Sequence, residues 1–284
     1  MEYSKYHGLG NDYIMIHPDA VGDDPVGALD SDTVARICRR RFGIGSDGIL
    51  LGPLPSESAD FALKIYNSDG SLAEKSGNGL RIFTRFLWDS GFVTDQPFRV
   101  ETDGGMVTCQ VTDEGKNIRV EMGQVVFSSD AIPMRGPGRE VLREELRVGD
   151  ESVTICAASL GNPHCVVLVD TPDEDEARRL GPLIEHHADF PQRTNVQFMT
   201  ALDRNNIRIE IWERGSGYTM ASGSSSTASA AVARRLGWCD DEITVHMPGG
   251  RLQLSFDDAF RATLNGPVAR VGTGRIAGDL LEPA

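Results

Sequence analysis

The sequence predicts an α+β protein built from two similar lobes. Strand-like apolar runs recur at short spacing along the chain, and each half contains a longer helical pattern. Two related segments, residues 67–79 and residues 213–224, each carry a Ser-Gly pair at the predicted start of such a helix. A site built from two such halves would place Ser76 and Ser222 on opposite faces of one small molecule. That geometry suits moving a proton across a carbon centre.

In the first half, short apolar runs bounded by turn residues predict strands, and apolar residues at helical spacing predict two helices. The helices cover residues 32–41 and 79–90, and Gly91 is a stop signal for the second of them. The predicted strands cover residues 12–16, 61–66, 99–102, 106–111 and 118–122.

The second half runs parallel to the first, after a connector rich in Pro and Gly over residues 130–139. Helices are predicted over residues 174–187 and 225–236. The predicted strands cover residues 153–157, 165–169, 195–200, 207–212, 243–247 and 252–256. In each half, the long helix could fill the hollow of a strongly curved sheet.

Composition and charge exclude several classes of protein. A net charge of −14 argues against nucleic acid as a partner, because phosphate binding requires basic patches. No apolar run approaches the ~18–20 residues that cross a bilayer, and the N-terminus lacks the pattern of a signal peptide. The five cysteines show no Cys-x-x-Cys spacing, which argues against a zinc site and against a disulfide framework. We therefore expect a cytoplasmic protein without metal, membrane or nucleic-acid partners, in which Cys109, Cys156 and Cys165 pack as small hydrophobes.

The two Ser-Gly segments suggest an anion site. Small residues at a helix start let the free backbone N–H groups approach a ligand, and the helix dipole favours a carboxylate there. Two such starts could hold one amino-acid α-carboxylate, with Ser76 and Ser222 beside the α-carbon. The alternative is that both serines are only N-caps, for which serine is a favoured residue. The backbone donors would belong to Gly77, Asn78, Gly223 and Ser224.

Several further motifs follow one another in a fixed order along nearly the full chain. They are His7-Gly8-Leu9-Gly10-Asn11-Asp12, Phe42-Gly43-Ile44-Gly45-Ser46-Asp47-Gly48, Asn67-x-Asp69-Gly70-Ser71, Gly77-Asn78-Gly79-x-Arg81, Gly161-Asn162-Pro163-His164, Asn195 and Glu213-Arg214-Gly215. At these residues the chain resembles the diaminopimelate epimerases, which are pyridoxal-independent amino-acid epimerases.

The resemblance implies the architecture in more detail. It implies two lobes, each a curved, mostly antiparallel sheet around a central helix, with the substrate between them. The last strand, near residues 268–276, would return to the first lobe. The expected lobes are therefore residues 1–124 with 267–284, and residues 125–266. Family members are often dimers, so the resemblance also suggests a homodimer.

The resemblance also implies roles for individual residues. Residues matching Asn11, Asn67, Asn162, Asn195 and Arg214 hold the substrate, and Glu213 belongs to the same binding set. Arginine and asparagine suit a distal amino-acid group, because they form planar, multidentate hydrogen bonds. His164 and Glu213 match positions that tune the two catalytic acid/base groups. The implied substrate is a small-molecule amino acid of the diaminopimelate type, and no cofactor is required if backbone dipoles stabilise the carbanion.

The chain departs from the family at the catalytic positions. The two acid/base residues of the family are cysteines, whereas this chain has Ser76 and Ser222. A cysteine thiol, with an ordinary pKa of about 8.5, can be brought into the working range by a helix start. A serine hydroxyl is a far weaker acid and normally needs a neighbouring base. Lys75, where the family usually has an apolar residue, could be that base if burial lowers its pKa; otherwise it is a solvated lysine beside a cap. Tyr218 replaces an expected acidic residue.

Three functions remain open from the sequence. The first is an amino-acid epimerase or racemase that uses the two serines. The second is a one-base isomerase or dehydratase on the same fold, similar to the phenazine-biosynthesis isomerases, with Glu74, Glu213 or His164 as the base. The third is a non-catalytic amino-acid binder. A dinucleotide site at residues 43–48 is rejected, because the Gly-x-Gly-x-x-Gly pattern follows a predicted helix rather than a strand.

Overall fold

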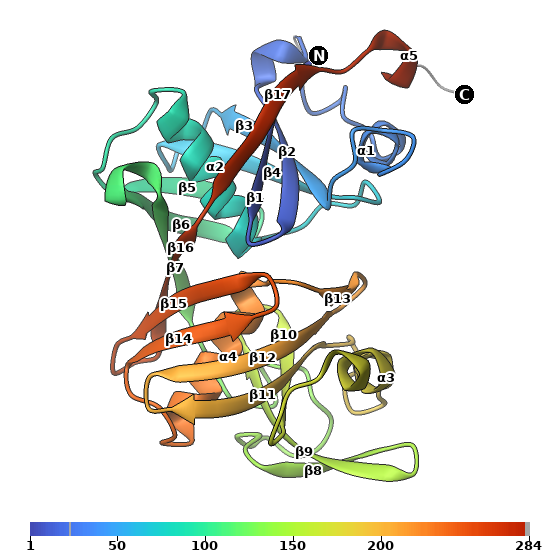
Figure 1. The fold of residues 1–284 in the computed structure, drawn as a ribbon, viewed down its shortest axis with the longest axis vertical. Helices are drawn as coiled ribbons and strands as arrows, with labels where there is room; N and C mark the ends of the chain where they lie inside the picture. The colour runs from blue at the N-terminus through green and yellow to red at the C-terminus, as the bar shows by residue number, and fades with distance from the viewer. Residues whose placement is uncertain (23, 282–284) are drawn as a thin grey trace. The chain divides into compact units, whose positions relative to one another are not determined.

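The computed structural model describes residues 1–22 and 24–281. The chain forms two compact units, Met1–Val120 with Gly266–Ala284, and Glu121–Asn265. Two strands, β7 (Asn117–Gln124) and β16 (Arg261–Pro267), carry the chain from one unit to the other (Figure 1). Within the described residues, no helix is long and apolar enough to cross a membrane.

The first unit is a mixed sheet in which most neighbouring strands are antiparallel. Only the β2–β3 and β4–β5 pairs are parallel among the pairings of its named strands. Strand β17 pairs antiparallel with β1, so the last strand lies in the first unit. Its elements are β1 (Glu2–Gly8), β2 (Asn11–Ile16), η1 (Pro18–Ala20), α1 (Ser31–Cys38), β3 (Gly48–Leu54), β4 (Phe61–Asn67), α2 (Gly77–Asp89), β5 (Phe98–Thr102), β6 (Gly105–Thr112), η2 (Asp113–Gly115), β17 (Ala269–Arg275) and α5 (Gly278–Leu281).

The second unit is built in the same way. Its parallel pairs are β10–β11 and β12–β14, and its other pairs of named strands are antiparallel. Its elements are β8 (Glu144–Val148), β9 (Glu151–Ser159), β10 (Pro163–Leu168), α3 (Glu174–Glu185), β11 (Asn195–Asp203), β12 (Asn206–Glu213), β13 (Gly217–Thr219), α4 (Gly223–Arg235), β14 (Glu242–Met247) and β15 (Gly250–Phe256).

The order of pairings is repeated in the two units. Each has an antiparallel hairpin (β1–β2, β9–β10), a parallel step around an outer helix (β2–α1–β3, β10–α3–β11), a second hairpin and then a central helix. The hairpin turns also share a sequence, Leu9-Gly10-Asn11 and Leu160-Gly161-Asn162. Gly10 and Gly161 both have a left-handed backbone, with φ of 93° and 99°. The repeat makes each strand of one unit the counterpart of a strand in the other.

The central helices lie against several strands of their own units. Helix α2 contacts β1, β2, β3 and β6, and α4 contacts β9, β10, β11, β12, β14 and β15 (Figure 1). This arrangement confirms the predicted α+β class. The outer helices α1 and α3 pack on the sheets through buried residues such as Val34, Ile37 and Leu180. The five cysteines are buried free thiols, in agreement with the structural role expected for three of them.

The two central helices fill their sheets differently. Helix α2 buries the large side chains of Leu80, Phe83 and Leu87 on its inner face. Helix α4 is buried almost all round and consists mainly of Ala, Ser and Gly. Because strands approach α4 closely on several sides, only small side chains fit between its backbone and the sheet.

Both central helices begin two residues earlier than the sequence predicts. Apolar spacing becomes visible only at residues 79 and 225, whereas the helices begin at Gly77 and Gly223. The first turns consist of small residues that carry no apolar periodicity, so their start is set by the preceding cap. Helix α1 instead ends early, at Cys38, because Arg39 has an extended backbone (φ −60°, ψ 120°).

Overpacking tests the tight fit of α4. Ala231 is fully buried, so Ala231→Leu is expected to lower the free energy of unfolding by about 1–3 kcal/mol, measured by urea denaturation. Ala231→Ser is the control, because the helix already accommodates buried hydroxyls such as Ser226, which donates to a carbonyl of the preceding turn. Equal stability of the leucine variant and the parent protein would contradict the packing described for α4.

Candidate active site

Ser76 and Ser222 are the N-caps of the two central helices. Their backbones are nearly identical, with φ and ψ of −140° and 118° at Ser76 and −146° and 127° at Ser222. The Ser76 hydroxyl oxygen accepts a hydrogen bond from the Gly79 amide at 3.0 Å. The Ser222 oxygen accepts one from the Ser225 amide at 3.3 Å. The two Ser-Gly segments therefore have the same local geometry in their separate units.

The first turns of both helices favour an anion. Neither first turn contains an acidic residue that would repel a carboxylate. Gly77, Asn78 and Gly223 are buried, and Ser224 is half-buried. The first amides of a helix have no partner within it, and the dipole concentrates positive charge there. Each start can thus bind a carboxylate oxygen through backbone N–H groups.

In the first unit, the start of β2 lies against the start of α2. The Asn78 side-chain amide donates to Asn11 Oδ1 at 2.9 Å. The Tyr13 hydroxyl lies 3.4 Å from the Ser76 hydroxyl. Asn11 and Tyr13 project from the same face of β2, because side chains two apart in a strand share a face. Arg81, fully buried, donates to Asn78 and so holds this asparagine in place.

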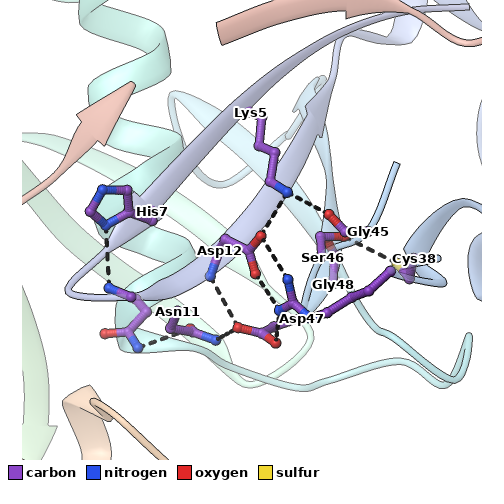
Figure 2. Close-up of polar contacts among 12 residues, drawn as sticks. Lys5, His7, Asn11, Asp12, Cys38, Gly45, Ser46, Asp47 and Gly48 are labelled. Atoms are coloured by element: carbon purple, nitrogen blue, oxygen red, sulfur yellow. Dashed lines mark hydrogen bonds and ion pairs between the residues drawn. The ribbon is translucent and has the colours of Figure 1, made fainter. Parts of the chain in front are cut away.

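A network of charges fixes the turn that carries Asn11. Asn11 donates from its side-chain amide to Asp47 at 2.8 Å, and the backbone amide of Asp12 donates to the same carboxylate at 3.1 Å (Figure 2). Arg40 bridges Asp12 and Asp47, and Lys5 lies 2.8 Å from Asp12. Burial would raise the pKa of Asp12, but hydrogen bonds from Arg40 and Lys5 hold it below its usual range. Both ends of the Asn11 amide are therefore held by the protein.

Asn67 and Lys75 flank the start of α2. Asn67 ends β4, where it pairs with Gly48 of β3, and its side-chain amide donates to the Ser71 hydroxyl at 3.0 Å. Lys75 is half-buried, with its Cβ close to Gly104. Burial lowers the pKa of Lys75, whereas the neighbouring Cys109 thiol raises it. The direction of this shift is the one that a catalytic lysine requires.

In the second unit, the starts of β10 and β11 bring the predicted residues together. His164 and Asn195 are register partners on these parallel strands. His164 Nε2 lies 3.2 Å from the Asn162 side chain. Asn195 donates to the Pro163 carbonyl and accepts from the Arg214 amide, each at 3.0 Å. All five residues lie at the edge of the sheet where β10 and β11 begin.

His164 is fully buried, and burial lowers its pKa to about 3. Gln197 opposes this shift, whereas the charge of Arg214 adds to it. His164 Nδ1 and Gln197 Oε1 are both buried without a hydrogen bond of good geometry. A neutral imidazole with a proton on Nδ1 is the complement of that oxygen. Gln197 in turn donates to the Ser225 hydroxyl at 3.0 Å, which links His164 to the first turn of α4.

The Glu213-Arg214-Gly215 segment is held by a residue that the sequence does not single out. Glu185, only 3% exposed, accepts from the Gly215 amide at 3.0 Å and from the Trp212 indole at 2.8 Å. Glu213 itself is half-buried at the end of β12. The Arg214 side chain donates to the Gln192 carbonyl at 3.1 Å. Glu185 therefore sets the course of the chain through Arg214.

Tyr218 turns away from these residues toward α3. Its hydroxyl donates to Glu210 at 2.7 Å, and the Arg178 guanidinium lies 4.3 Å from the ring centre. A groove of about 840 Å³ in the first unit does not belong to the candidate site, because none of its lining residues is a predicted site residue. Across the described residues, no group of three His, Cys, Asp or Glu side chains is placed to hold a metal ion.

The sequence gives weak signals for the supporting residues that it misses. Gln197 stands between apolar residues of a buried strand, where a polar side chain needs a partner. Tyr13 follows the repeated Leu-Gly-Asn turn at the position where His164 follows the second copy. Glu185 is one of several acidic residues in a charged helix, so no local pattern distinguishes it.

Residues 3–128 and 156–271 match the family model for diaminopimelate epimerase. The chain belongs to the diaminopimelate epimerase family. A relative from a Nostoc species, named diaminopimelate epimerase 2, is 51% identical over 280 residues, which cover 99% of this chain and 97% of the relative. A diaminopimelate epimerase from Desulfitobacterium hafniense is 38% identical over 286 residues, which cover 99% of this chain and 100% of the relative. The predicted family is confirmed, and with it the isomerase class.

Solved structures share the fold of this family member at low sequence identity. A hydroxyproline epimerase from Agrobacterium vitis has a TM-score of 0.71 at 18% identity, covering 98% of this chain and 93% of that one. A PhzF-family phenazine biosynthesis protein from Bacillus anthracis has a TM-score of 0.64 at 16% identity, covering 96% and 98%. The sequence relatives named above are epimerases, which does not favour the one-base isomerase or the non-catalytic binder.

The buried imidazole should make stability depend on pH. His164 in the folded protein has a pKa of about 3, below the ordinary histidine value of 6.5, so the unfolded chain binds a proton that the folded one excludes. The free energy of unfolding should therefore fall as the pH decreases below 6.5, by about 1.4 kcal/mol per pH unit from this group. His164→Gln should remove that component of the slope, measured by denaturation between pH 4 and 7. His186→Gln, at an exposed ring, is the control, and equal slopes in all three proteins would contradict a buried neutral imidazole.

Proposed function

We propose that this protein is a cofactor-independent amino-acid epimerase that moves the α-proton of a zwitterionic amino acid between the two faces of the α-carbon. Ser76 acts on one face and Ser222 on the other. The observation that carries the proposal is the equal geometry of the two serines, each an N-cap with the same backbone conformation. A two-base inversion needs one acid/base group on each face of the carbon, and the repeat supplies one serine from each unit.

The helix starts stabilise the charge that develops during the reaction. Removal of the α-proton places negative charge on the α-carbon and the carboxylate. Backbone N–H groups at Gly77, Asn78, Gly223 and Ser224 would bind that carboxylate. Hydrogen bonds from fixed donors of this kind strengthen as negative charge develops on the carboxylate, and the donors need no reorganisation. In racemases that use pyridoxal phosphate, the cofactor stabilises this charge instead.

The distal end of the substrate meets amide and guanidinium groups. Asn11, Asn67, Asn162, Asn195 and Arg214 offer donors and acceptors that match a second ammonium and carboxylate. We therefore propose a substrate of the diaminopimelate type, with Glu213 near the ammonium group. This substrate would place the protein in lysine biosynthesis in the cytoplasm, and the resemblance implies a homodimer.

The supporting residues divide into two kinds. His164 stays neutral because it is buried, so we assign it a positioning role for Asn162 and the α4 start rather than proton transfer. Lys75, with its lowered pKa, is a candidate to accept a proton from Ser76. Without help, a serine hydroxyl exchanges protons far more slowly than a thiol, and we expect turnover slower than that of a Cys/Cys enzyme.

Isotope exchange tests the proposed reaction directly. LL-diaminopimelate incubated in D2O with high enzyme concentrations should gain deuterium at one α-carbon and form the meso isomer, detected by NMR and mass spectrometry. Substrate recovered without deuterium, under conditions where binding is seen by calorimetry, would contradict the proposal and favour a non-catalytic binder.

Removal of one serine hydroxyl should block proton transfer at one face of the α-carbon and leave the other face active. Ser76→Ala and Ser222→Ala should each reduce epimerisation by at least about a hundredfold, because one acid/base group is lost. Each variant should still exchange the α-proton of the one stereoisomer that faces the remaining serine. Ser229→Ala, a buried hydroxyl in the same α4 helix, is the control and should leave turnover unchanged. Normal turnover in the double alanine variant would point to a single base elsewhere.

Thiols at both positions should raise activity. The Ser76→Cys and Ser222→Cys double variant introduces groups with an ordinary pKa of about 8.5 at helix starts that favour the thiolate. We expect exchange at pH 8 to increase by about a hundredfold or more, the size of effect that a well-matched acid/base group supplies. The control is Ser229→Cys. An unchanged rate in the double variant would show that the two serines do not contact the α-proton.

A further inference from the structure

We infer that Tyr13 is a positioning residue that donates a hydrogen bond to the Ser76 hydroxyl and stabilises its alkoxide, which makes the two serines chemically unequal. This inference rests on the proposed role of Ser76. Its starting point is the 3.4 Å separation between the Tyr13 and Ser76 hydroxyl oxygens. A contact of this length is loose for two neutral hydroxyls and should shorten when one of them carries charge.

The Tyr13 ring has little freedom to move away. Tyr13 is 6% exposed and lies on β2 beside Gly48 of β3, its register partner. A Cβ atom at Gly48 would lie 2.6 Å from Tyr13 Cε1 and 2.3 Å from the Tyr66 carbonyl oxygen. The ring therefore occupies the space that a side chain at position 48 would need. This close approach fixes the position of the phenolic oxygen next to the N-cap of α2.

The repeated topology identifies the counterpart of Tyr13. Strands β2 and β10 follow the same Leu-Gly-Asn turn, so Tyr13 corresponds to His164. The register agrees, because Tyr13 pairs with Gly48 at the start of β3, as His164 pairs with Asn195 at the start of β11. At corresponding positions of the two units, the chain thus carries a phenol in the first and an imidazole in the second.

The surroundings of these two side chains differ. In the second unit, Gln197 and Ser225 offer polar groups, and the His164 imidazole lies near Asn162 and Gln197. The corresponding residues of the first unit are Leu50 and Gly79. A Cβ at Gly79 would meet the Leu50 side chain at 3.2 Å, so this contact is apolar. The Tyr13 hydroxyl instead lies 3.4 Å from the hydroxyl of the capping serine, Ser76.

The proton balance of the step needs no further reactant. When Ser76 acts as the acid, its Oγ–H bond breaks as the α-C–H bond forms, and the negative charge passes from the carbanion to Oγ. That oxygen then accepts from the Gly79 amide and the Tyr13 hydroxyl, and Tyr13 keeps its own proton. In the reverse direction the alkoxide removes the α-proton. Hydrogen bonds to a charged oxygen are stronger than those between neutral groups, so Tyr13 favours the alkoxide.

A thiol at position 76 reports this hydrogen bond without any need for turnover. In a Ser76→Cys protein, a donor from Tyr13 should lower the thiol pKa and speed alkylation by iodoacetamide at pH 7, followed by mass spectrometry of the peptide containing position 76. Adding Tyr13→Phe should slow that alkylation by about tenfold, because a donor to a charged atom is lost. Adding Tyr6→Phe is the matched control and should not change the rate. Tyr6 is a buried tyrosine of the same unit whose hydroxyl donates to Asp89 instead.

Isotope exchange supplies the second readout. Tyr13→Phe in the parent protein should slow α-proton exchange about tenfold for the stereoisomer that Ser76→Ala also blocks, with KM and the exchange of the other stereoisomer unchanged. Equal slowing of both stereoisomers, or an alkylation rate that Tyr13→Phe does not change, would overturn the inference. A shift in alkylation together with no exchange in the parent protein would support the hydrogen bond and contradict the proposed function.

Discussion

Each candidate half-site depends on one hydrogen bond within its own unit, from a backbone amide of the first helical turn to the oxygen of the capping serine. Such a cap contributes about 1 kcal/mol to helix stability and fixes the serine in an extended backbone at the helix start. The same oxygen is the candidate acid/base group, so one atom would serve both as the helix cap and in proton transfer. An oxygen that accepts from the helix amide still carries a proton of its own to donate.

The remaining residues hold the elements around these caps. Buried Arg81 and the Asp12–Asp47 network fix the turn of Asn11, and buried Glu185 fixes the segment of Arg214. They are charged side chains with several hydrogen bonds each, which is how a protein makes a buried charge tolerable. The loops that present the amide and guanidinium groups are therefore held in place by several hydrogen bonds.

Local patterns in the sequence were sufficient for most strands, for the central helices and for the family. Local patterns do not predict strand β3, because Gly48–Leu54 is a short apolar run interrupted by Gly52 and Pro53. The contacts of Tyr13, Gln197 and Glu185 arise between strands or between a helix and a loop. Periodicity describes which face a side chain occupies, not which residue of another element it meets. The burial of His164, which keeps it neutral, has the same origin.

The repeated Leu-Gly-Asn turns have a consequence for the energetics of an inversion reaction. A catalyst leaves the equilibrium constant between two stereoisomers unchanged, so dissimilar neighbours at the two caps can alter barrier heights but not the final ratio of the stereoisomers. In the proposed two-base reaction, each turnover would leave the free enzyme in the protonation state opposite to the one in which it started. The phenol beside one cap and the imidazole in the second copy would give those two forms different energies. The free enzyme would then exist mainly in the form of lower energy, a preference that two matching copies would not impose.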